Sequence, residues 1–321
     1  MSPSPQIPHP PGAKHRGAEP LRPARTRGRR EAVSGEPPDP QGETPAPRRR
    51  GRQSRRSPQS LQSRDELLVV VDVGNTNTVF GVYRGDRLIE SFRLSTDTER
   101  TGDEYGSLLL PLFSLHGIDP LAADAVVISS VVPPLHLTLD HLAQRYFGQR
   151  PLFVEPGVRT GMPIRYDNPL EVGADRVVNS VAARERYGAP VIVVDFGTAT
   201  TFDVVNAAGE YVGGIIAPGI GISAEALFAH ASRLIRVDVR KPDELVGKNT
   251  AAAIQAGIFY GYVGLVDGIL ERLLAEIPGV KMVVATGGQA DLIASGSKYI
   301  REVDPLLTLL GLKLIYERNR G

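Results

Sequence analysis

Two segments of this chain share a residue pattern that is suited to binding phosphate groups. Residues 72–79 read AspValGlyAsnThrAsnThrVal and residues 195–203 read AspPheGlyThrAlaThrThrPheAsp, each after a valine-rich apolar run. Small polar residues in such a turn expose backbone N–H groups toward phosphate oxygens, and an Asp at a strand end can hold a cation that offsets the phosphate charge. The pattern predicts two related half-domains around a phosphate-bearing ligand, with Gly74 and Gly197 in tight turns of positive φ.

A hairpin between two core strands, with its Asp and Asn present only for the turn, explains one copy alone equally well. The repetition makes this alternative much weaker. The chain has no GxxxxGK[ST] loop and no GxGxxG at a strand end, so neither a P-loop nor a Rossmann dinucleotide site is indicated.

A third cluster, residues 166–176, places an acidic and a basic side chain in the first turn of a predicted helix. In the functional interpretation, Asp175 accepts a proton from a substrate hydroxyl and Arg176 binds a carboxylate through paired hydrogen bonds. A base in phosphoryl transfer needs position more than basicity, because the transition state is loose. The alternative is that Asp175 only stabilises the helix N-terminus.

Three glycine-containing segments are weaker candidates. In residues 247–250, Thr250 either caps the long helix that follows, faces the expected ligand cleft, or does both. Lys248 could meet a phosphate, but a solvated side chain is the simpler interpretation. Residues 285–289 form a turn between a strand and a helix that lets the backbone approach a nucleotide. The glycines between 213 and 221 form another close-approach loop, with close packing between elements as the alternative.

The elements that must position these residues alternate between strands and helices, which is typical of α/β architecture. Nearly continuous valine-rich runs predict buried strands rather than amphipathic helices. Three strands followed by alternating helices, twice over, predict two tandem ribonuclease H-like domains, 65–188 and 189–321, with the ligand cleft between them. Strands are expected at 67–73, 78–84, 87–95, 125–131, 151–155, 190–196, 200–205, 210–216 and 281–285. Helices are expected at about 102–116, 135–147, 174–187, 219–229, 250–276, 288–295 and 305–318.

Residues 1–64 differ in composition from the rest of the chain. They carry 14 basic and five acidic residues and 13 of the 26 prolines, whereas the remainder carries 23 basic and 31 acidic residues. Such a segment cannot bury enough apolar area to offset its ordering entropy, so a disordered basic extension, or one absent from the mature protein, is expected. The alternative is an arm that binds nucleic acid or another polyanion. The acidic folded part is not expected to bind nucleic acid.

The chain has no cysteine, which excludes disulfides and thiolate metal sites, and its six histidines show no metal-ligand spacing. No apolar stretch approaches the roughly 18 residues of a membrane span, and the N-terminus lacks the apolar core of a signal peptide. A cytoplasmic protein without membrane contact is the expectation.

Taken together, the motifs resemble those of type III pantothenate kinase, over about residues 67–319. The family belongs to the superfamily of acetate and sugar kinases, chaperone ATPases and actin. The resemblance implies ATP-dependent phosphorylation of pantothenate to 4'-phosphopantothenate, the first step of coenzyme A biosynthesis. It rests on 72–79, 195–203, GlyAlaAspArg (173–176), GlyLysAsnThr (247–250), IleSerSerValValPro (128–133), ArgTyrAspAsnPro (165–169) and GlyIlePheTyrGlyTyr (257–262).

The resemblance also implies a role for individual residues. Asp175 is the proton acceptor, Thr198 contacts ATP, and Asp195 holds K⁺ or NH₄⁺, which the family uses alongside Mg²⁺. The family is typically a cytoplasmic homodimer and normally lacks an extension before Leu67. The residues implied to bind ATP phosphates are Asp72, Val73, Gly74, Asn75, Thr76, Asn77, Thr78 and Val79. The residues implied to contact pantothenate are Tyr166, Gly173, Ala174, Asp175, Arg176 and Thr250.

Two other functions are compatible with parts of this pattern. One is a nucleotide-responsive regulatory or binding protein of the same fold that has no transfer step. Asp175 argues against it, because a protein that only hydrolyses or senses ATP needs no base for the hydroxyl of a second substrate. The other is a kinase of another small hydroxy acid.

Overall fold

The computed structural model of the protein describes residues 66–231 and 233–320. The extension predicted to be disordered, residues 1–64, lies outside the described residues. Every strand and helix predicted from the sequence is present, and each has both ends within two residues of the predicted bounds.

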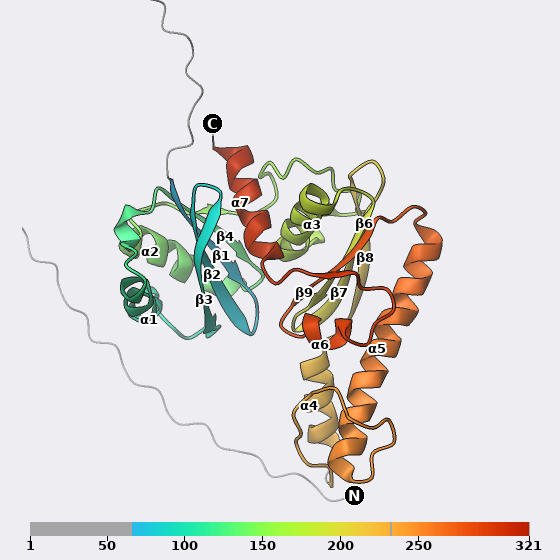
Figure 1. Cartoon of the computed structure of the whole chain (residues 1–321). Helices are drawn as coiled ribbons and strands as arrows, with labels where there is room; N and C mark the ends of the chain where they lie inside the picture. The colour runs from blue at the N-terminus through green and yellow to red at the C-terminus, as the bar shows by residue number, and fades with distance from the viewer. Residues whose placement is uncertain (1–65, 232, 321) are drawn as a thin grey trace, which may run out of the picture. The chain divides into compact units, whose positions relative to one another are not determined.

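The first half of the described chain forms a five-stranded sheet with the strand order β3-β2-β1-β4-β5. β1 is antiparallel to β2 and parallel to β4. The helices α1 (Gly102–Leu115) and α2 (His136–Tyr146) cover one face of this sheet (Figure 1), where Tyr105, Phe113 and Leu139 are fully buried. The strands are β1 (Leu67–Val73), β2 (Asn77–Arg84), β3 (Arg87–Ser95), β4 (Ala125–Ser130) and β5 (Leu152–Phe153).

The second half repeats this layout with the strand order β10-β9-β6-β7-β8. The pairing of the first two strands is antiparallel in both halves but shifted by one residue, because Asp72 of β1 lies opposite Val79 of β2, seven residues on, and Asp195 of β6 lies opposite Thr201 of β7, six residues on. The short strand β10 was not predicted, since a two-residue run has no periodicity to detect. The strands are β6 (Val191–Phe196), β7 (Ala199–Val205), β8 (Tyr211–Pro218), β9 (Met282–Gly287) and β10 (Glu302–Val303).

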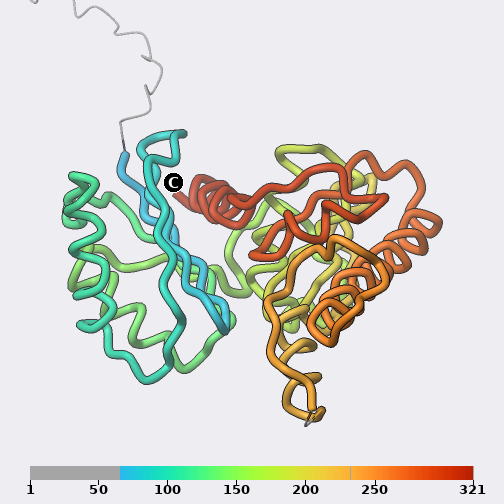
Figure 2. The backbone as a smooth tube through the Cα atoms, turned by 60° about the horizontal axis from the view of Figure 1, so that its bottom comes forward, coloured from blue at the N-terminus to red at the C-terminus, as the bar shows by residue number. Residues whose placement is uncertain are grey.

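Two helices connect the halves through a shared core. α3 (Ala174–Tyr187) contacts β4, β6 and β7, whereas α7 (Leu307–Asn319) contacts β1, β4 and α3. Figure 2 shows α7, in red, beside the blue strands of the first half. The helices cross closely, because a Cβ atom added at Gly311 would lie 2.2 Å from the carbonyl oxygen of Val178. Since one core contains side chains from both halves, the domain boundary at 188/189 stays a prediction.

The remaining helices are α4 (Ile220–His230), α5 (Thr250–Glu276) and α6 (Ala290–Ala294), with short 3₁₀ helices at Pro120–Ala122, Pro133–Leu135 and Pro169–Glu171. Contrary to the sequence-based expectation, α5 is long and apolar enough to cross a membrane by length and composition, and it is the one such helix in the described ranges. A helix of a protein core meets the same criterion. One side of α5 packs in this way, because Ile258, Val266 and Leu270 are buried in the core of the second half, and 33% of the apolar segment is buried in all.

Candidate functional site

Three predicted carboxylates come together from three different elements. Asp72 is the last but one residue of β1, Asp195 holds the same place in β6, and Asp175 is the second residue of α3. The pKa of Asp72 is raised to about 8, mainly by burial and also by the charges of Asp175 and Asp195. A hydrogen bond with Ser129 and the charge of Arg93 lower the same pKa by less.

Asp195 has a similar environment. Its pKa is raised to about 7, mainly by burial and also by the charges of Asp175 and Asp203, against a hydrogen bond from Asn179 (3.0 Å) that lowers it. Thr308 of α7 in turn donates a hydrogen bond to the Asn179 carbonyl oxygen (2.7 Å), which orients the amide. Asn179 was missed in the sequence, although it lies four residues after Asp175 and therefore on the same side of α3.

When its members are ionised, the carboxylate cluster of Asp72, Asp175 and Asp195 carries negative charge that a cation would offset. None of the three forms an ion pair with Lys or Arg within residues 66–231 and 233–320. In the same part of the chain, no three acidic or histidine side chains are arranged to ligate one ion. The cluster therefore fits an ion that takes one or two carboxylates and completes its shell with phosphate oxygens and water, as Mg²⁺ does at nucleotide sites.

The two Asp-Gly turns face each other across the cluster. The hydroxyl oxygens of Thr76 and Thr198 are 3.0 Å apart, within hydrogen-bond distance, so the repeat seen in the sequence is also a contact in the structure. The predicted positive φ is wrong for Gly74 and Gly197, since neither adopts that conformation. Each glycine N–H instead closes its turn by donating to a carbonyl two or three residues ahead, at 3.0 Å in both cases.

The residues predicted to bind ATP phosphates differ in what they expose. Asn75, Thr76 and Asn77 are exposed, so their side chains are available, whereas the carbonyl oxygens of Thr76 and Asn77 already accept hydrogen bonds within the fold. Val73 is buried in the core, and the buried Thr78 hydroxyl is 2.9 Å from that of Thr96. The side chains of Val73 and Thr78 therefore shape the turn, and only exposed neighbours offer side chains to a ligand.

Asp175 is positioned by the first turn of its own helix. Its Oδ1 accepts a hydrogen bond from the backbone N–H of Arg176 (2.8 Å), which satisfies one of the free donors of the helix start. A Cβ atom added at Gly173 would lie 2.5 Å from that oxygen, so glycine is required for this carboxylate position. Burial raises the pKa of Asp175. The structural and the functional interpretation of Asp175 are therefore compatible with each other.

Arg176 is buried and has a partner that was not assigned from the sequence. Its Nε donates to Oδ1 of Asp203 on β7 (2.7 Å), with side-chain exposures of 8% and 0%. Tyr211 (2.9 Å) and Thr201 (3.1 Å) also donate hydroxyl hydrogen bonds to Asp203. Burial raises the pKa of Asp203 to about 6, which leaves the pair charged at pH 7. Among the described residues, Nη2 of Arg176 is buried without a hydrogen-bond partner.

This geometry changes the prediction for Arg176. Because Asp203 occupies the Nε position, the predicted paired hydrogen bonds to a substrate carboxylate cannot use that donor and must come from the Nη groups, of which Nη2 is buried without a partner among the described residues. A Cβ atom added at Gly214 would lie 2.9 Å from Nη2, and one at Gly213 would lie 3.4 Å from the Tyr166 ring. The two glycines of β8 therefore let Arg176 and the exposed Tyr166 pack closely over the strand, in agreement with the close-packing alternative.

Glycine backbones also enclose the second turn. Gly287, at the end of β9, has a φ of 92°, and a Cβ atom there would lie 2.5 Å from Oδ1 of Asp195. A Cβ atom at Gly219 would lie 2.1 Å from the carbonyl oxygen of Thr198. The weak candidates of the sequence, around 285–289 and 213–221, are thus next to Asp195 and Thr198 in space.

Thr250 lies in a different environment. It begins α5 and is exposed, and the N-cap is its neighbour Asn249, whose side chain accepts the N–H of Ala252 (2.9 Å). No hydrogen bond within the described ranges links Thr250 to the carboxylate cluster. Lys248 pairs at the surface with Glu244 (2.9 Å), as expected for a solvated lysine.

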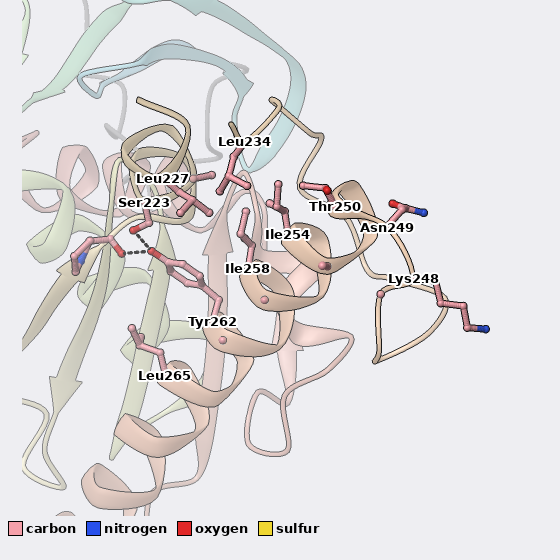
Figure 3. Close-up of a pocket in the computed structure, with 16 residues that line it drawn as sticks. Ser223, Leu227, Leu234, Lys248, Asn249, Thr250, Ile254, Ile258, Tyr262 and Leu265 are labelled. Carbon is pink, nitrogen blue, oxygen red and sulfur yellow. Dashed lines mark hydrogen bonds between the residues drawn. The ribbon is translucent and has the colours of Figure 1, made fainter. Parts of the chain in front are cut away.

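An apolar groove of about 960 Å³ lies between α4 and α5, and Thr250 is on its wall (Figure 3). Leu227, Ile254 and Ile258 point into it from the two helices. At one end, the Tyr262 hydroxyl is hydrogen bonded to Ser223 and also contacts the carbonyl oxygen of Gly219 (2.9 Å). The groove thus joins the turn around Gly219 to the predicted substrate residue Thr250.

Known proteins resemble this chain in sequence and in fold. The pattern of the family described as Type III pantothenate kinase matches residues 68–272. Relatives named type III pantothenate kinase from Koribacter versatilis and Myxococcus xanthus are 57% identical over 265 residues and 58% identical over 255 residues. These alignments cover 79% of this chain in both cases, and 97% and 100% of the relatives.

A solved structure from Sinorhizobium meliloti, described as a 2-dehydro-3-deoxygalactonokinase protein, is similar in fold. Its TM-score is 0.50 at 13% identity, over 78% of this chain and 96% of that chain. Together with the two five-stranded sheets of matching strand order, this likeness confirms the predicted class of two ribonuclease H-like units.

Proposed function

This chain belongs to the type III pantothenate kinase family, and we propose that it transfers the γ-phosphoryl group of ATP to pantothenate with Asp175 as the proton acceptor. The product is 4'-phosphopantothenate, and the reaction is the first step of coenzyme A biosynthesis. The observation that supports the assignment of roles most directly is the convergence of Asp72, Asp175 and Asp195 beside two linked threonine turns.

The two turns bind the phosphate groups of ATP. The exposed residues 75–77 offer backbone N–H groups and short polar side chains, which suit phosphate oxygens. Thr198 of the second turn lies 3.0 Å from Thr76, so both turns reach the same phosphate chain. Gly287 keeps the backbone after β9 close to this point, where a nucleotide can pack against it.

Two aspartates hold the cations of the reaction. Asp72 holds Mg²⁺, which neutralises charge on the transferring phosphoryl group when it is bound with ATP. Asp195, oriented by Asn179, holds the monovalent K⁺ or NH₄⁺. The raised pKa values of both carboxyl groups support these roles, because a cation lowers the cost of keeping each of them ionised.

Asp175 accepts the proton of the primary hydroxyl of pantothenate. Its carboxylate is fixed by the N–H of Arg176 and by the absence of a side chain at Gly173, so it meets the hydroxyl in one orientation. Positioning of this kind supplies most of what a loose phosphoryl-transfer transition state requires.

Arg176 binds the carboxylate of pantothenate through Nη2, a buried donor that has no partner among the described residues. Asp203 holds the guanidinium through Nε, and Tyr166 covers it over Gly213. The buried cation therefore has a fixed orientation before the substrate arrives, which reduces the entropy lost on binding. Thr250, on the wall of the neighbouring groove, also contacts pantothenate in this proposal.

Two copies of the chain associate through the groove between α4 and α5, and the enzyme works in the cytoplasm, where its ATP is supplied. Apolar side chains from both helices line this groove, and a second copy would cover them by two-fold symmetry. Leu227→Asp should shift the protein from dimer to monomer in sedimentation. Leu115→Asp on α1, where the side chain is 78% exposed, is the control and should leave the dimer intact.

An ATP-consumption assay with pantothenate and a panel of small hydroxy acids tests the function. Pantothenate should be the preferred acceptor, and Asp175→Asn should lower kcat by at least about 10²-fold while ATP still binds. The matched control is Asp103→Asn, because Asp103 is the second residue of α1 as Asp175 is of α3. Undiminished turnover by Asp175→Asn would contradict the base, and preference for another acid would contradict the substrate.

The cation roles are tested separately. We expect little activity when Na⁺ replaces K⁺ and NH₄⁺, and equal rates in all three would contradict the role of Asp195.

A further inference from the structure

Arg93 of β3 is a cationic side chain on the cleft side of the first sheet. It lies opposite Val79 in the β2–β3 pair, and directly opposite residues of an antiparallel pair share a face. Val79 packs against the core shared by the two halves, whereas the neighbouring Phe92 packs under α1 and α2. Arg93 therefore extends from the face of the sheet that looks toward the second half.

The guanidinium of Arg93 reaches the turn that follows β9. A Cβ atom added at Gly288 would lie 3.8 Å from Nη1 of Arg93. Its charge also acts on Asp72, whose pKa it lowers against the larger effect of burial. The positive charge is therefore placed between two segments from different halves, the Asp72 turn and the Gly287–Gln289 turn, which both border the proposed phosphate site.

Arg93 is free to take an anionic ligand. It is exposed, and within residues 66–231 and 233–320 no carboxylate lies within ion-pair distance of it. Arg176, by contrast, is already bound to Asp203, and Lys248 to Glu244. A guanidinium offers donors in a planar fork that matches the oxygens of a phosphate group.

We propose that Arg93 binds the phosphate chain of ATP across the cleft, between the Asp72 turn and the Gly287–Gln289 turn. It supplies the positive charge on the side of the phosphates opposite to the carboxylate cluster and its cations. The inference rests on the proposed function only in taking ATP as the ligand, and it requires no assumption about the acceptor.

Calorimetric binding of MgATP and of adenosine to the whole protein, without pantothenate, tests this contact. Arg93→Gln should weaken MgATP binding by about tenfold or more, as expected for loss of charged hydrogen bonds, and should leave adenosine binding unchanged. Arg93→Lys should fall between wild type and Arg93→Gln, because the charge is kept and the fork is lost. Arg87→Gln, at the other end of β3, is the matched control and should bind MgATP as wild type does.

Two results would overturn the inference. One is MgATP affinity of Arg93→Gln within twofold of wild type. The other is an equal loss for MgATP and adenosine, which would indicate a disturbed cleft rather than a lost phosphate contact. A wild-type protein that binds MgATP through Arg93 but does not phosphorylate pantothenate would refute the proposed function and leave this contact standing.

Discussion

The free enzyme should lose stability as the pH rises, because of the buried carboxyl groups, and Asp72→Asn should remove the part of this loss that Asp72 contributes. The pKa of Asp72 is raised from 3.8 to about 8 in the folded protein. A group whose pKa is higher in the folded state stabilises fully below its unfolded pKa, and this contribution is lost as the pH rises through the folded value. For Asp72 that window runs from about pH 4 to pH 8.

The magnitude follows from the size of the shift. A difference of about four pKa units, at about 1.4 kcal/mol each, corresponds to a loss of at most roughly 5 kcal/mol by pH 8. Between pH 5 and pH 8 the expected loss is roughly 3–4 kcal/mol. Asn has the shape of Asp and no charge, so Asp72→Asn should be more stable than wild type at pH 8 and close to it at pH 5. The same variant should be inactive, because in the proposed function Asp72 holds Mg²⁺.

Urea unfolding of the ligand-free protein at pH 5 and pH 8, in buffer without divalent ions, measures this difference. Asp103→Asn, which removes an exposed carboxylate, should follow the wild-type pH dependence. Addition of MgATP should flatten the wild-type profile and leave that of Asp72→Asn nearly unchanged. Parallel pH profiles of wild type and Asp72→Asn would refute the claim that ionisation of Asp72 lowers the stability. A wild type that gains stability from pH 5 to pH 8 would refute the predicted direction of the pH dependence.

Three further predictions concern the residues that support the site. Asp203→Ala should lower the free energy of unfolding by about 3–5 kcal/mol, because it leaves the Arg176 cation buried without a partner, and adding Arg176→Met should recover part of it. Glu225→Ala breaks an ion pair of similar length at the surface (2.6 Å) and should cost under about 1 kcal/mol; equal losses in denaturant melts would contradict the burial argument. Gly173→Ala should lower kcat and have little effect on Tm, because its Cβ would displace the Asp175 carboxylate. Unchanged kinetics would contradict that positioning role. Gly311→Ala should destabilise by about 1–3 kcal/mol through contact with Val178, whereas Gly264→Ala, on an open side of α5, should stabilise by up to about 1 kcal/mol; a stabilising Gly311→Ala would show that α3 and α7 adjust to each other freely.

Much of the fold could be read from local patterns. The valine-rich runs before Asp72 and Asp195 allow only buried strands, and α3 begins and ends where its sequence predicts. β10 could not be read in this way, because its two residues pair only where β9 is already in place. The positive φ expected for Gly74 and Gly197 was also wrong, since a glycine identifies a tight turn but not the dihedral angles with which the turn closes.

The residues of the candidate site also fall into those that local sequence patterns identify and those that only the folded structure identifies. Asp72, Asp175, Asp195 and the two turns could be found in the sequence, because each is a local chemical pattern that is repeated or placed at an element end. Asn179, Asp203 and Arg93 could not be assigned, because each acts through a partner distant in sequence. Arg176 shows the difference most clearly, since the sequence suggests a free guanidinium and the structure gives it a buried partner 27 residues away.

By itself, then, the sequence determined the strands, the helices, the repeated Asp-Gly turn and the residues able to transfer a phosphoryl group. Only the tertiary structure decided which of those groups meet, what charge they carry, and which donors are left for a ligand. The physical reason is that strand and helix formation depend on neighbours along the chain. Desolvation, repulsion between carboxylates and competition for hydrogen bonds depend instead on distances in space, which the packing of α3 and α7 between the two sheets sets.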